Sequence, residues 1–373
     1  MRCATTVRSP QGSRPPAVSS LSRRAVTLTF PIPKPCKKNP ALRFLPLFLL
    51  PLLLLANLFY GSVDLPAAQV VQALLGQTPA HDVATVIVLQ SRLPQLCTAL
   101  LAGCSLSVSG LVMQTVFANP LADPSILGVS SGAGLGAALA LLLFGGSWTA
   151  GTFVLSGHLL TVFFAFLGAM AVIALLLACS ALLRSNLLLL VTGVMVSFAV
   201  SSVVALLNFF ATAEGVRSYV IWGLGDFSGV TLQRLPFFAA LTLPALLAVA
   251  LMSKPLNALL LGRDYAANLG IPVGRVRALL LFLSGLLTAV VTALCGPISF
   301  IGLAVPHMAR LTLRTANHRL LVPATLLWGA DVALFCNFLS HLPGDRGLLP
   351  LNAITPLLGV PVVLYILFRR RTF

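Results

Sequence analysis

Few residues of this sequence could take part in covalent chemistry. His307 and Arg310 stand three residues apart, so they share a face if their segment is helical. Asp331 lies in the middle of a long apolar segment, where an ionised carboxylate costs roughly 2.5–3.5 kcal/mol unless it is paired or hydrated. Two interpretations of Asp331 stay open, a buried hydrogen-bonded residue and a polar residue on a translocation path. His158 is alone in an apolar stretch and suits a packing role.

The motifs of phosphate, metal and redox chemistry do not occur. The sequence contains no G-x-x-x-x-G-K-[ST] loop for ATP phosphates and no constellation with metal-ligand spacing. Its seven cysteines include no C-x-x-C pair, and most lie in apolar sequence, which favours buried thiols over disulfides. We therefore expect no cofactor, no bound metal and no enzymatic activity in this chain.

The composition indicates which elements must position these residues. Hydrophobic residues make up 58% of the 373 residues and charged residues 9%, with a mean hydropathy of +0.99. A soluble domain needs about 25% charged residues, so this is a polytopic membrane protein. The net charge of +16 comes from basic residues in the N-terminal tail and between apolar runs. That distribution fits cytoplasmic loops and not nucleic-acid binding.

Stretches free of charge measure the membrane crossings, because one crossing needs about 20 apolar residues. They predict an all-α membrane protein of ten transmembrane helices, within one domain over 44–373. The segments are 43–64, 92–123, two in 123–184, 184–214, 234–254, two in 277–310, 319–343 and 346–369. An even number of crossings places both termini on the same side of the membrane. Only four of the 24 basic residues then lie outside, so both termini are expected to be cytoplasmic.

The first 43 residues form a different region. They contain nine basic and no acidic residues, are rich in Ser and Pro, and show no apolar periodicity. We expect a disordered basic extension. An organellar transit peptide and a start codon assigned too far upstream are the alternatives.

Two short segments resemble each other. Residues 123–129 read DPSILGV, and residues 296–303 read GPISFIGL. Each has a Pro at an expected helix start, then an apolar turn and a Gly. The crossing count places the first at the cytoplasmic side and the second at the outer side. This predicts an inverted internal repeat, as transporters have.

Residues 92–136 carry the longest motifs of the chain. They read RLPQLCTALLAGCSLSVSGLVMQTVFANPLADPSILGVSSGAGLG, and GRDYAANLG at 262–270 and GPISFIGLAVPHMAR at 296–310 follow. The sequence resembles the FecCD-like permeases, the membrane subunits of ABC importers for iron chelates, haem and vitamin B12. The resemblance covers roughly residues 45 to 370. Gln95 departs from the pattern, since the family often has a second Arg there.

The resemblance implies a fold like that of the vitamin B12 importer permease and a loop that docks on a cytoplasmic ATPase. From its residues alone, the loop better fits a helix lying on the membrane surface. The implied coupling residues are Leu256, Arg263, Asp264, Tyr265, Ala266, Leu269 and Gly270.

Other residues receive roles in the translocation path or its gate. Ser185 and Asn186 form a short turn that, by resemblance, lies near the inner constriction. Asn119 belongs to a polar turn that is either a capped loop or part of the gate. His307 and Asp331 are the expected polar residues of the path.

Three arginines are candidates for docking an external binding protein. Arg92 opens the second helix, while Arg217 and Arg346 lie in outer loops. They either mark the membrane edge or pair with acidic residues of the binding protein, because an Arg fork holds a carboxylate in a defined geometry.

The sequence thus predicts the permease subunit of an ABC importer for an iron chelate (siderophore or haem) or cobalamin in a bacterial inner membrane. The expected partners are the lipid bilayer, a second copy of the chain, two ATPase subunits and a periplasmic or lipoprotein substrate-binding protein. The alternative is a secondary transporter driven by an ion gradient. Such carriers usually need several ionisable residues in their spans, and only Asp331 qualifies clearly.

Overall fold

A computed structural model describes residues 41–370 except 78, 80, 126, 146, 151, 152, 184, 345 and 346. All of these belong to the unit Ile32–Phe373. The predicted extension lies outside the described residues up to residue 40. The first helix begins at Ala41, three residues before the boundary predicted at 44.

The described chain is almost entirely helical, because its apolar runs are long and satisfy their own backbone hydrogen bonds, as a membrane requires. The first half contains α1 (Ala41–Phe59), α2 (Ala67–Leu74), α3 (Val83–Val86), a π-helical turn η1 (Ile87–Arg92), α4 (Leu93–Val116), α5 (Val129–Ala138), η2 (Leu139–Leu143), α6 (His158–Leu182) and α7 (Asn186–Phe210). The second half contains α8 (Ala213–Gly223), α9 (Leu235–Leu251), α10 (Ser253–Leu260), α11 (Arg263–Asn268), α12 (Val273–Cys295), α13 (Ile301–Leu313), α14 (His318–Ser340) and α15 (Leu351–Arg370).

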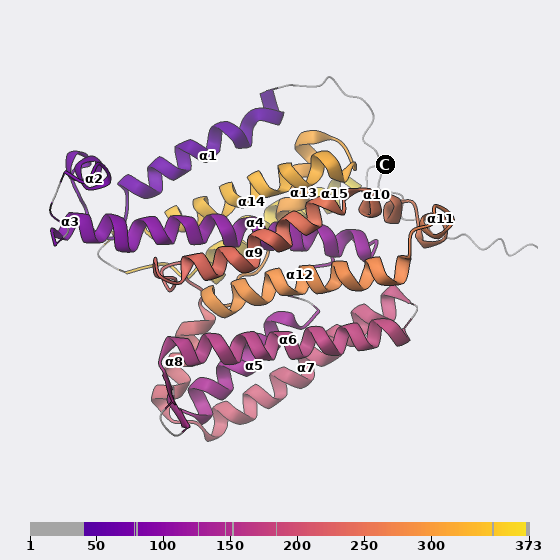
Figure 1. The fold of residues 1–373 in the computed structure, drawn as a ribbon, viewed down its shortest axis with the longest axis horizontal. Helices are drawn as coiled ribbons and strands as arrows, with labels where there is room; N and C mark the ends of the chain where they lie inside the picture. The colour runs from indigo at the N-terminus through magenta and orange to yellow at the C-terminus, as the bar shows by residue number, and fades with distance from the viewer. Residues whose placement is uncertain are drawn as a thin grey trace, which may run out of the picture. The chain divides into compact units, whose positions relative to one another are not determined.

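Helix α4 is the centre of the bundle. It packs against α14, α12, α13 and α9. Helices α5, α6 and α7 form a group on one side, and α1 packs on α14 on the other (Figure 1). The short helices α2 and α3 lie at one end of the bundle, and α10 and α11 lie at the opposite end, which we call the α11 end (Figure 1).

Five described helical segments are long and apolar enough to cross a membrane. They are Val83–Val116, His158–Leu182, Asn186–Phe210, Val273–Cys295 and His318–Ser340. Helices α9 and α10 together would give a sixth, bent by 54°. Three shorter apolar helices, Arg43–Phe59, Val129–Leu143 and Leu351–Tyr365, accompany them. Several crossings are therefore confirmed, while the number ten stays a prediction.

One element differs from the all-α expectation. Residues Ser147–Ala150 (β1) and Phe153–Ser156 (β2) pair antiparallel, with Trp148 opposite Leu155. The glycines around position 146 predict a turn between two helices, and this turn is extended into a hairpin. The sequence showed only the turn, because a four-residue strand is too short for a period-2 pattern.

Helix α4 approaches its neighbours through glycine. A Cβ atom on Gly110 would stand 1.8 Å from the carbonyl oxygen of Gly302 in α13. A Cβ atom on Gly103 would stand 2.2 Å from the carbonyl oxygen of Gly329 in α14. Small residues at such crossings bring two backbones into contact, which is how helices gain packing energy in a membrane.

The two similar segments meet inside the bundle. A Cβ atom on Gly302 would stand 2.6 Å from Oδ2 of Asp123, so these residues are in contact. This contact lies inside the bundle and does not assign either segment to one side of the membrane. Both enter the bundle, because α13 begins at Ile301 beside α4 and Asp123 is buried. The inverted relation between them stays a prediction.

Candidate functional site

The predicted coupling loop forms a small helical unit at the α11 end. Helix α11 lies between Gly262 (φ +111°) and Gly270 (φ +77°). Both residues have a left-handed backbone that glycine adopts without strain, which explains the sharp turns on either side of six helical residues. The unit packs against the start of α12.

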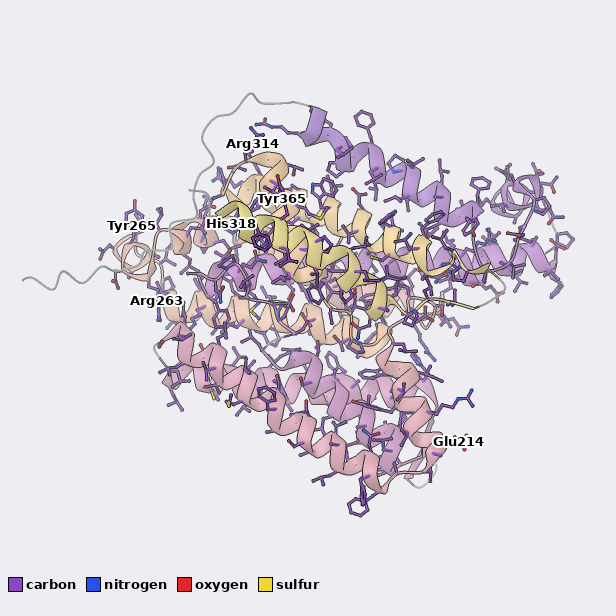
Figure 2. All side chains as sticks on the ribbon, turned by 180° about the vertical axis from the view of Figure 1, so that it is seen from behind. Glu214, Arg263, Tyr265, Arg314, His318 and Tyr365 are labelled. Carbon is purple, nitrogen blue, oxygen red and sulfur yellow. The ribbon has the colours of Figure 1, made fainter. Side chains whose placement is uncertain are left out.

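The seven predicted coupling residues divide into two groups. Leu256 and Ala266 are fully buried, so they hold the loop against the bundle and do not face a partner. The exposed group consists of Arg263, Asp264, Tyr265, Leu269 and Gly270. Figure 2 shows Arg263 and Tyr265 at the tip of this end, far from Glu214 of α8.

The exposed surface continues into an open groove. Leu261, which is not among the predicted coupling residues, is 65% exposed and lines the groove together with Tyr265. The groove is lined by Lys254, Asn257, Ala258, Leu261, Tyr265, Leu269, Asn317 and Arg319. Its exposed apolar side chains and the basic residues Lys254 and Arg319 suit a protein partner with apolar and acidic side chains.

A chain of hydrogen-bonded polar groups connects this groove to α4. Asn257 of α10 accepts hydrogen bonds from the backbone N–H of His318 (2.8 Å) and pairs with its ring Nδ1 (2.9 Å). The other ring nitrogen, Nε2, lies 2.9 Å from Oγ1 of Thr115 near the end of α4. Asn257 also donates to Asn317, the N-cap of α14 (2.9 Å). His318 is fully buried. His318, labelled in Figure 2, thus connects α14 with α10 and α4.

The S-G-x-x-x-Q motif formed by Ser109, Gly110 and Gln114 positions α4 against its neighbours. Ser109 contacts the hydroxyls of Ser284 (2.7 Å) and Thr288 (2.9 Å) in α12. Gln114 donates to the carbonyl of Leu303 in α13 (3.2 Å) and accepts a hydrogen bond from Arg310. These contacts make the motif a structural junction.

Asp123 and Asn119 shape the turn that follows α4. Oδ1 of Asp123 accepts the backbone N–H of Ser125 (2.8 Å), and Oδ1 of Asn119 accepts that of Leu121 (3.0 Å). Burial raises the pKa of the Asp123 carboxyl, and the bond from Ser125 opposes this rise. Both residues fit the capped-loop interpretation, and a gating role for Asn119 stays a prediction.

The predicted gate residues lie at the start of α7. Ser185 is its N-cap and is exposed, with Oγ accepting the N–H of Leu188 (3.4 Å). Asn186 donates to the carbonyl of Val116 at the end of α4 (3.0 Å). The structure therefore brings the end of α4 and the start of α7 together at the α11 end.

The two polar path candidates are both buried. His307 pairs through Nδ1 with the carbonyl of Leu303, one turn earlier in α13 (3.0 Å). Asp331 is 1% exposed, and neither carboxylate oxygen has a hydrogen-bond partner among the described residues. It lies in α14, which packs closely on α4. Their place on a path stays a prediction.

Arg92 is not an exposed docking residue within the chain. It is 5% exposed and donates to the carbonyls of Leu58 (2.7 Å), Phe59 (3.0 Å) and Val63 (2.5 Å). Its guanidinium therefore caps α1, whose last carbonyls have no intrahelical partners. Arg217 of α8 is exposed, so its docking role stays a prediction. Arg346 lies outside the described residues.

Nothing in the described part of the chain resembles a metal centre, since no three potential metal-ligand side chains gather there. The five described cysteines are unpaired, and Cys295 and Cys336 are buried.

Comparisons with known proteins agree on one family. The FecCD transport family matches residues 49–369. The chain is 39% identical over 285 residues to the vitamin B12 import system permease protein BtuC of Klebsiella pneumoniae, covering 76% of this chain and 82% of that protein. It is 36% identical to BtuC of Escherichia coli, covering 76% and 83%. A metal-chelate type ABC transporter solved in an inward-facing conformation superposes with a TM-score of 0.76 and 31% identity, covering 88% of this chain and 99% of that one.

Proposed function

Because the chain belongs to the FecCD transport family, we propose that it is the permease subunit of an ABC importer that carries cobalamin across a bacterial inner membrane. The observation that carries the proposal is the 39% identity to a vitamin B12 permease along 82% of that protein. An iron chelate is the second candidate, favoured by the superposition on a metal-chelate type transporter.

The α11 end supplies the mechanism. We place it in the cytoplasm, where the groove and the exposed Tyr265 and Leu269 receive an ATPase subunit. Movement of α10 would reach α4 through Asn257, His318 and Thr115, because hydrogen-bonded side chains in a packed interior shift together. Transport then needs no covalent chemistry from this chain. It needs only two arrangements of the bundle, which ATP hydrolysis by the partner interconverts.

The assembly we propose contains two permease copies, two ATPase subunits and an external binding protein. A second copy would cover α7, which presents large apolar side chains such as Met195 (55% exposed), Phe198 (65%) and Leu206 (61%). Arg217, exposed on α8, remains the proposed contact for the binding protein.

Substrate and energy source are tested together in proteoliposomes. Permease and ATPase are reconstituted with the binding protein, and uptake of labelled cyanocobalamin, a ferric siderophore and haem is measured with ATP or with an imposed proton or sodium gradient. We expect ATP-dependent cyanocobalamin uptake. Uptake driven by the gradient without ATP would establish the secondary transporter instead, and siderophore uptake alone would establish the second substrate.

A further inference from the structure

A buried arginine lies beside the coupling loop. Arg277, in α12, is 4% exposed. Its Nε and Nη2 atoms are buried and have no hydrogen-bond partner among the described residues. Arg275, two residues earlier, is exposed. Buried charges in proteins are normally paired and hydrogen-bonded, because water no longer stabilises them.

The surroundings of Arg277 add positive potential. Arg263 of α11 lies close enough to repel it. Arg277 is also one turn from the start of α12 at Val273, the positive end of the helix dipole. Arg92 is equally buried, yet its guanidinium is satisfied by three carbonyls. The Nε and Nη2 atoms of Arg277 have no such acceptor among the described residues. An anion contributed by a partner would supply one.

The position of α12 favours a protein carboxylate over a lipid phosphate. Helix α12 is surrounded by α4, α5, α6 and α9. Of its most apolar 18-residue stretch, 78% is buried. By contrast, only 11% of the corresponding stretch of α7 is buried. Arg277 lies near the start of α12 and close to Arg263 of α11, so a partner seated on α11 would be near it. An arginine fork also matches a carboxylate with two parallel hydrogen bonds.

We propose that Arg277 binds a carboxylate of the ATPase subunit, which enters beside α11 and completes an ion pair that the permease lacks on its own. The inference rests on the proposed function and adds to it a specific charged contact. It implies that the charge of Arg277 destabilises the isolated permease and is paired only in the assembled transporter.

The test compares Arg277→Met with Arg275→Met, an exposed arginine on the same turn. Permease in phosphatidylcholine nanodiscs is melted alone and titrated with the ATPase that supports uptake by the wild type. Arg277→Met should melt no lower than the wild type while binding the ATPase at least about tenfold more weakly. Arg277→Lys should bind with intermediate strength, and Arg275→Met should stay within about twofold of wild type.

A charge exchange identifies the partner group. Arg277→Glu should abolish binding, and one Asp→Arg or Glu→Arg change in the ATPase should restore it. Wild-type affinity in Arg277→Met, or a lower melting temperature with unchanged affinity, overturns the inference. If Arg277→Met weakens ATPase binding only in nanodiscs containing phosphatidylglycerol, Arg277 binds a lipid headgroup. That result would also overturn the inference. A wild-type permease that binds no ATPase of its genome rejects the proposed function itself.

Discussion

At the scale of single residues, the guanidinium of Arg92 replaces missing hydrogen-bond partners at the end of α1. The carbonyls of Leu58, Phe59 and Val63 all point at it. Asn57 extends the same polar region, since it accepts from Asn337 of α14 (2.9 Å). These bonds attach α1 to the bundle at one end, so their loss should affect stability before it affects docking.

We therefore predict that Arg92→Gln destabilises the permease by about 1–3 kcal/mol, the cost of leaving buried carbonyls unsatisfied. Thermal unfolding in detergent checks this. Arg217→Gln, on an exposed position of α8, is the matched control and should change the melting temperature little. Slower association of the binding protein with Arg92→Gln at full stability would restore the docking interpretation of Arg92.

His318 is the second residue whose contacts define its role. Its ring lies between Asn257 and Thr115, and neither contact survives replacement by leucine. We predict that His318→Leu lowers uptake per ATP hydrolysed severalfold, because movement of α10 no longer reaches α4 through hydrogen bonds. Uptake and phosphate release are measured in the same proteoliposomes. Leu320→Ala, exposed on the same helix, should keep the wild-type ratio, and an unchanged ratio in His318→Leu would refute the connection.

At the scale of elements, the coupling loop combines a buried and an exposed side. Asp264→Lys and Leu269→Asp change exposed positions, so the permease should stay folded while uptake falls. Leu256→Asp places a charge at a fully buried position and should unfold the loop or the whole permease. Size-exclusion profiles and uptake assays separate the two outcomes. Normal uptake with both exposed variants would remove this loop from coupling.

The crossing of α4 and α13 depends on the absence of a side chain. Gly110→Ala would bring a Cβ atom to 1.8 Å from the Gly302 carbonyl oxygen, so the helices must separate. We predict a loss of about 1–3 kcal/mol or more in stability. Gly274→Ala is the control, because no atom lies within 4 Å of its added Cβ. It should be neutral or slightly stabilising, since alanine favours the helix. Equal melting temperatures for both variants would contradict the tight crossing.

At the scale of the whole molecule, the exposed apolar face of α7 requires either lipid or a second copy. Ser185 lies at the start of this face and is exposed. We predict that Ser185→Cys forms a cross-link between two permease copies in one nucleotide state, detected as a dimer on a non-reducing gel. Arg217→Cys, in α8 beyond the opposite end of α7, is the comparison. Absence of a Ser185→Cys cross-link in every nucleotide condition would place this turn outside the gate.

Much of the architecture could be predicted from sequence, because crossing length and helix formation are local properties. The charge-free stretches located the apolar helices, and the resemblance to the permease family pointed to the loop around Arg263 as the predicted coupling loop. Neither showed which residues of this loop are buried. Leu256 and Ala266 look as suitable for a partner as Leu269 does, and only their packing on the bundle distinguishes them.

Contacts between distant segments were decided by the tertiary structure alone. Nothing in the sequence pairs Asp123 with Gly302, or His318 with Asn257 and Thr115. Composition determined that the chain is a membrane protein, because it has too few charged residues to form a water-exposed surface. The order of its motifs determined its family. The partners of its buried polar groups follow from which helices pack together. That depends on the fit of whole surfaces across the bundle, and no local pattern encodes it.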